Sequence, residues 1–104
     1  MNNITTEQQK HLVVILDDLI ATIEKMQKNY ADDIFLNRNI REARDWKKYL
    51  LEHLDKEEVL SLQEEVADRY FEEYSCLVDH SETDVKRAQL METFMDEAWK
   101  FISM

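Results

Sequence analysis

The sequence predicts an all-α protein, folded as a single-domain antiparallel four-helix bundle. Three observations predict this fold. Glycine and proline are both absent, although the tight turns of a small sheet protein usually need them. Apolar residues make up 44% of the 104 residues, which suffices for one hydrophobic core in a chain of this length. Finally, four segments repeat their apolar residues at helical spacing.

The first helix is expected to run from about Thr6 to Asn29. Its apolar residues recur at alternating spacings of four and three, and they form one inner stripe: Leu12, Leu16, Leu19, Ile23, Met26 and Tyr30. Such a stripe is typical of a helix that packs along a neighbour at a shallow angle. Thr5 with Gln8, or Thr6 with Gln9, would supply a capping box at its start.

The second helix is expected from about Asp33 to His53, with Asp32 as its N-cap. Its inner face holds apolar residues at helical spacing: Leu36, Ile40, Ala43, Trp46 and Leu50. Trp46 lies in the middle of this face, so we expect its side chain to be buried. The five bases of this segment lie elsewhere on the helix: Arg38, Arg41, Arg44, Lys47 and Lys48.

The third helix is expected to begin at Asp55, which starts a capping-box pattern ending at Glu58. It carries two adjacent apolar stripes. The first comprises Val59, Leu62, Val66, Tyr70 and Leu77, and the second comprises Leu60, Ala67, Phe71, Tyr74 and Val78. Together the two stripes are wide enough to contact two neighbouring helices.

The fourth helix is expected to begin after a cap at Ser81, which Asp84 follows three residues later. Its inner stripe is again apolar: Val85, Ala88, Met91, Met95, Ala98 and Ile102. Four helices of roughly equal length with short connections favour antiparallel neighbours. A long helical hairpin that dimerises into a bundle is the competing architecture.

The net charge of −10 is concentrated in one part of the chain. Residues 55–84 carry −9, whereas residues 1–30 carry −1 and the remaining segments are neutral. Such a charge argues against direct binding of nucleic acid or of an anionic membrane. The net charge by itself does not identify a partner. A docking surface for a basic protein is one interpretation of the acidic segment.

The third helix carries an acidic face that we predict to be a protein-binding site. Its members are Glu64, Glu65, Asp68, Glu72 and Glu73. Three of them follow one another at four-residue spacing, so that each repels the next by a few tenths of a kcal/mol. Two alternatives stay open. The face is merely solvated, or its acids pair internally with the bases of the second helix.

No pattern for catalysis, a cofactor or a metal is present in the sequence. A glycine-rich phosphate loop requires glycine, and the Glu-x-x-His motif of di-metal bundles does not occur. Cys76 and His80 are spaced for a shared metal, but two ligands do not make a site. We therefore expect no cofactor, no metal and no enzymatic activity.

The leading hypothesis is a non-enzymatic, small acidic helical protein that binds another protein, of the inhibitor, immunity, adaptor or antagonist type. One alternative is a nucleic-acid mimic that blocks a DNA- or RNA-binding protein, and another is a ligand- or metal-binding bundle. Whether the chain forms a homodimer stays an open question at this point. We expect no membrane span, since no stretch approaches ~20 apolar residues. The single cysteine and the polar N-terminus favour a cytoplasmic location.

Overall fold

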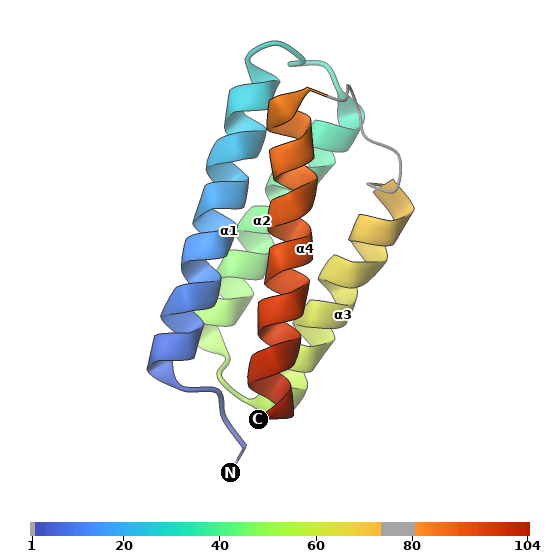
Figure 1. The fold of residues 1–104 in the computed structure, drawn as a ribbon. Helices are drawn as coiled ribbons and strands as arrows, with labels where there is room; N and C mark the ends of the chain where they lie inside the picture. The colour runs from blue at the N-terminus through green and yellow to red at the C-terminus, as the bar shows by residue number, and fades with distance from the viewer. Residues whose placement is uncertain (1, 74–80) are drawn as a thin grey trace.

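The computed structural model describes residues 2–73 and 81–104 of the chain. It contains four helices: α1 (Thr6–Gln27), α2 (Ile34–Glu52), α3 (Lys56–Glu73) and α4 (Glu82–Ser103). The helices run alternately in opposite directions along one axis (Figure 1). The predicted antiparallel four-helix bundle is confirmed, and one chain supplies all four helices.

Side-chain caps fix where three of the helices begin. Thr5 and Gln8 form the predicted capping box, with each side chain accepting from the other's backbone N–H at 3.0 and 2.8 Å. Asp55 and Ser81 likewise accept hydrogen bonds from backbone amides in the first turns of α3 and α4. These contacts satisfy donors that a helix start otherwise leaves unpaired.

The cap of α2 differs from the prediction at Asp32, because the neighbouring residue takes that role. The Asp33 carboxylate accepts from the backbone N–H groups of Phe35 and Leu36 at 2.9 and 3.0 Å. Asp33 has extended backbone angles, as an N-cap requires. The helix therefore starts at Ile34, one residue later than expected.

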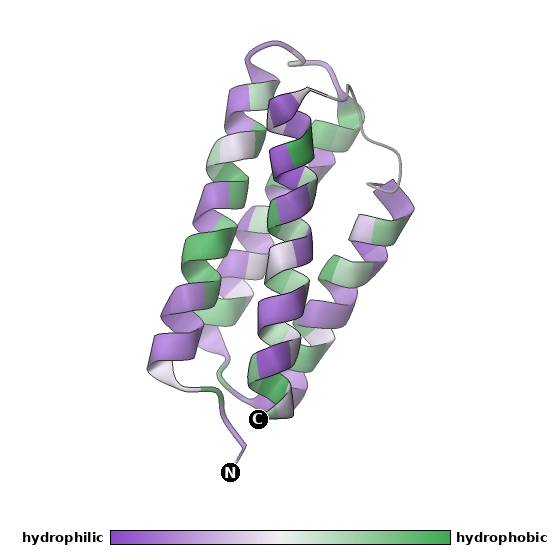
Figure 2. Ribbon diagram, viewed as in Figure 1, coloured by the Kyte–Doolittle hydropathy of each residue, from purple (hydrophilic) through white to green (hydrophobic). Residues whose placement is uncertain are grey.

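The inner stripes of the four helices meet in one hydrophobic core. Tyr30, predicted as the last residue of the first stripe, is an exception, because it is 41% exposed. Hydrophobic and hydrophilic residues alternate around each helix, as a bundle with one apolar face per helix requires (Figure 2). Trp46 is 2% exposed, which confirms its predicted burial. Trp99, at the edge of the α4 stripe, is 55% exposed.

The N-terminal segment closes one end of the bundle. Ile4 is buried, and its backbone N–H donates to the Leu54 carbonyl at 2.8 Å. The Lys56 N–H donates to the Asn2 carbonyl at 2.7 Å, so both bonds hold the connection between α2 and α3. This end of the α2–α3 pair is therefore anchored by backbone hydrogen bonds.

One of the seams between neighbouring helices is loosely packed. α1 packs along both α2 and α4, and α3 packs along α4, whereas α2 and α3 contact each other sparsely. The predicted second stripe of α3 does not close this seam, since Leu60 and Ala67 are half-buried and Phe71 is exposed. The stripe residues Tyr74, Leu77 and Val78 lie outside the described residues.

Candidate functional site

The seam between α2 and α3 is lined by polar side chains from both helices. On α2 these are Arg38, Glu42, Asp45 and Tyr49, and on α3 they are Ser61, Glu65, Arg69 and Glu73. Apolar side chains drive close helix packing, because their burial removes them from water. The charged edges of this seam explain why α2 and α3 pack more loosely than the other neighbours.

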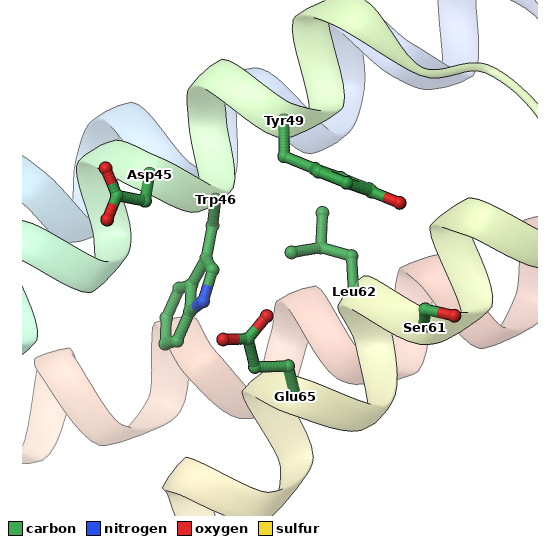
Figure 3. A pocket seen from close by; sticks show the side chains of 6 residues that line it. All are labelled: Asp45, Trp46, Tyr49, Ser61, Leu62 and Glu65. Carbon is green, nitrogen blue, oxygen red and sulfur yellow. The ribbon is translucent and has the colours of Figure 1, made fainter.

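A groove of about 220 Å³ opens in the middle of this seam (Figure 3). Three side chains of α2 and three of α3 line it: Asp45, Trp46, Tyr49, Ser61, Leu62 and Glu65. Trp46 and Leu62 are each 2% exposed and belong to the hydrophobic core. Asp45 and Glu65 are exposed, so the groove has an apolar floor and two carboxylates at its rim.

The two rim carboxylates are unpaired, which sets them apart from other acids of the seam. Neither Asp45 nor Glu65 makes an ion pair or hydrogen bond within the described residues. Glu58, two turns before Glu65, pairs with His53, and Glu72, two turns after it, pairs with Arg69 at 3.1 Å. Glu65 is thus unpaired, whereas the acids two turns before and two turns after it each have a partner.

The floor of the groove also presents an unused hydrogen-bond donor. The edge of the Trp46 ring that carries the nitrogen faces the Glu65 side of the groove (Figure 3). Within the described residues this indole N–H donates no hydrogen bond, and Trp46 as a whole is 2% exposed. The nitrogen itself is not fully buried, so a group in the groove has this donor available to it.

Tyr49 reports a negative environment at the groove. Burial, followed by the carboxylates of Glu58, Asp55 and Glu65, raises the pKa of its phenol above the ordinary value of 10.0. Its ring also lies against His53, with the ring centroids 4.0 Å apart. The phenol therefore stays neutral at physiological pH, and the surrounding field favours a cation over an anion.

Four of the five predicted site acids are exposed, as the docking hypothesis requires. Glu64 and Asp68 lie on the outer surface of α3, Glu65 lines the groove, and the Glu72 side chain is 65% exposed. Asp45, Trp46 and Tyr49 were not among the site residues predicted from the sequence. Their role in the groove arises from the position of α3 beside α2, which local periodicity does not reveal.

Glu73 departs from the predicted exposed face. Its side chain is only 4% exposed and pairs with Arg38 and Arg69, and the Arg69 contact is 3.6 Å. Arg69 also binds Glu42 at 2.8 Å. The internal-pairing alternative is therefore correct for Glu73, because its carboxylate faces the bases at the far end of the α2–α3 seam.

The other bases of α2 behave differently from the internal-pairing alternative. Lys47 pairs with Asp17 at 2.7 Å and Arg44 with Glu24 at 3.6 Å, so both face α1 instead of α3. These pairs are largely exposed, and exposed pairs contribute about 0–1 kcal/mol each. The acids on the outer surface of α3 are therefore not paired with these two bases.

A buried polar cluster that sequence analysis missed joins α4 to α2. Arg87 and Asp84 are 0% exposed and form an ion pair at 2.6 Å. Arg87 Nη1 also donates to the Asn39 Oδ1 atom at 3.4 Å, and Asn39 is likewise 0% exposed. The available signals were the spacing of Asp84 and Arg87, one turn apart, and a polar Asn39 on the inner face of α2.

Three further findings concern metal binding, membrane spans and similarity to known proteins. Within residues 2–73 and 81–104 no three His, Cys, Asp or Glu side chains are grouped so as to hold a metal ion, and the Cys76–His80 pair lies outside those ranges. None of the helices described is both long and apolar enough to cross a membrane. Comparisons with models of protein families, with curated proteins and with solved structures give no significant match.

Proposed function

We propose that this chain is a non-enzymatic protein-binding bundle, whose α2–α3 face receives a basic segment of another protein. The observation that carries the proposal is the groove with an apolar floor and two unpaired carboxylates at its rim. Lysine and arginine side chains combine an aliphatic stem with a charged end. They therefore match a site that is apolar inside and negative at its mouth.

The charge distribution supports the same class of partner. Residues 55–84 carry −9 of the net −10, and Glu64 and Asp68 add exposed carboxylates on the helix that forms one wall of the groove. Charge of one sign along a binding surface raises the association rate of an oppositely charged partner and selects against like-charged ones. A basic segment would be attracted to this face before it enters the groove.

The groove favours a protein partner over nucleic-acid mimicry. A mimic needs exposed carboxylates that stand in for phosphates, and the pairing of Glu73 with Arg38 withdraws one from the row. Mimicry also has no use for Trp46 and Leu62 at the floor of a groove. An apolar floor beside charged groups is instead typical of sites that bind protein side chains.

The test is binding of capped basic, neutral and acidic peptides of equal length, measured by calorimetry at two salt concentrations. We expect binding of the basic peptides alone, weakened by salt. Asp68→Asn should weaken it, whereas Asp18→Asn, a matched change on the exposed surface of α1, should not. Absence of binding by every basic peptide, or equal effects of the two substitutions, would contradict the proposal.

A further inference from the structure

The groove between α2 and α3 is small for a drug-sized ligand and suited to one side chain. Its volume of about 220 Å³ lies below the roughly 300–1,000 Å³ of pockets that bind small molecules. Besides the hydroxyls of Tyr49 and Ser61, its walls offer two kinds of polar group. Asp45 and Glu65 are unpaired acceptors at the rim, and the Trp46 indole N–H is an unpaired donor that faces the interior (Figure 3).

These groups narrow the chemistry of the occupant. A phosphate or a carboxylate would meet two carboxylates and be repelled. A free polyamine supplies cations but has no acceptor for the indole N–H. A peptide with a lysine or arginine supplies an aliphatic stem for the floor, a cation for the rim and a backbone carbonyl for Trp46.

We infer that the groove binds one lysine or arginine side chain of a partner peptide, between Asp45 and Glu65, with a carbonyl of the same peptide accepting from the Trp46 indole N–H. This inference rests on the proposed function and names the chemical groups that the site recognises. It assigns the binding residues to the groove instead of to the acidic face as a whole.

The two carboxylates should contribute unequally. Arg41 and Lys48 lie within one turn of Asp45 on α2, and their positive charges screen it. The base within one turn of Glu65 on α3 is Arg69, which is engaged by Glu42, Glu72 and Glu73. Glu65 is therefore the stronger anchor for a cation.

A second copy of the chain is a poorer occupant than a basic peptide. Two copies each carry −10, and like charges at an interface oppose association. The free acids Glu64 and Asp68 flank the groove on its outer side, so a partner that covers the groove also meets their charge. Charge complementarity thus selects a basic partner.

Trp46 provides the readout for the test. Trp99 is 55% exposed, so Trp99→Phe leaves Trp46 as the remaining one of the two tryptophans. This protein is titrated with capped peptides that carry a central arginine or lysine, with the matching glutamine peptide, and with spermidine. Trp46 fluorescence gives the affinity, and the NMR signal of the indole N–H reports hydrogen bonding.

We expect basic peptides to bind at least about tenfold more tightly than the glutamine peptide, with the indole N–H signal moving downfield. Glu65→Gln should weaken this binding about tenfold, Asp45→Asn should weaken it less, and Asp18→Asn should leave it unchanged. Thermal unfolding of each variant checks that the bundle remains folded.

Two results overturn the inference but leave the proposed function standing. In the first, basic peptides bind and Asp68→Asn weakens their binding, but Glu65→Gln does not change the affinity and the Trp46 signals do not respond to the peptides. In the other, spermidine moves the indole signal as a basic peptide does, which would remove the role of the carbonyl. A third result, no binding by any basic peptide, contradicts the inference and the proposed function together.

A downfield shift of the indole N–H signal that grows with protein concentration in the absence of peptide would identify a second copy of the chain as the occupant. That result would also overturn the inference.

Discussion

Arg87 and Asp84 lie one turn apart in α4 and form an ion pair with both side chains fully buried, with Arg87 Nη2 2.6 Å from Asp84 Oδ1. Arg87 Nε donates to the same oxygen at 3.0 Å. Arg87 also reaches Asn39 of α2, so a polar contact links two helices within the hydrophobic core. Buried pairs of this kind are strongly destabilising to break, because the remaining partner keeps an uncompensated charge.

Substitution of Arg87 should therefore lower the free energy of unfolding substantially. Arg87→Met leaves Asp84 buried without this ion-pair partner, and we expect the free energy of unfolding to fall by about 3–5 kcal/mol. Urea denaturation measures the change. Lys47→Met breaks the exposed pair with Asp17 and should cost about 0–1 kcal/mol. Equal effects of the two substitutions would show that the Arg87 pair is not buried.

Trp46 and Trp99 should respond in opposite ways to solvent and to truncation. Trp46 is 2% exposed and Trp99 is 55% exposed. Trp46→Ala opens a cavity in the core and should lower the free energy of unfolding by about 3–5 kcal/mol. Trp99→Ala should cost far less. In single-tryptophan proteins, iodide should quench Trp99 readily and Trp46 poorly, and strong quenching of Trp46 would refute its burial.

Alkaline pH should destabilise the bundle through two tyrosines of the α2, α3 and α4 interfaces. Burial raises the pKa of Tyr49 and of Tyr70, and a hydrogen bond to Glu92 adds to the effect at Tyr70. The folded state then holds these protons more tightly than the unfolded chain. Their stabilising contribution is complete below pH ~10 and is lost as pH rises through the folded pKa values.

The measurement is phenolate absorbance during an alkaline titration, combined with urea denaturation at each pH. Tyr49→Phe and Tyr70→Phe should each remove one late-titrating group and make the unfolding free energy less sensitive to pH above ~10. A late-titrating signal that is unchanged in both the Tyr49 and the Tyr70 variants would contradict the assignment.

Helix positions and the core could be predicted from sequence because helical packing repeats locally. An apolar side chain every three or four residues specifies a buried face without knowledge of its partner. This reasoning placed Trp46 correctly. It failed by one residue at the α2 cap because Asp32 and Asp33 both have capping side chains, and the choice between them depends on the backbone angles at the helix start.

The groove and the buried charges depend on contacts between helices and were beyond local patterns. Glu73 belongs by spacing to an acidic surface, yet the position of α3 directs it toward Arg38 across the seam. Asp45 and Glu65 are 20 positions apart in the sequence and line one groove only because α2 and α3 lie antiparallel. Sequence alone placed Glu65 on an acidic face but did not reveal the aromatic floor beside it.

Substitution of Asp68 distinguishes an acidic face that binds a partner from one that only keeps the protein in solution. It is exposed, has no ion pair within the described residues, and lies one turn from both Glu64 and Glu72. Asp68→Asn relieves like-charge repulsion and should raise the free energy of unfolding by a few tenths of a kcal/mol. If the α3 face binds a basic segment, the same substitution should weaken binding and increase stability together.

Urea denaturation of the free protein and titration with a basic peptide measure these two effects of Asp68→Asn. Glu73→Gln gives the contrasting case, because it removes the charge that faces Arg38 and Arg69 in the buried end of the seam. It should lower the free energy of unfolding by about 1–3 kcal/mol, since it leaves those bases with a weaker partner. A loss of stability in Asp68→Asn would mean that Asp68, like Glu73, is paired within the bundle. The prediction that the acidic face is a free binding surface would then be wrong.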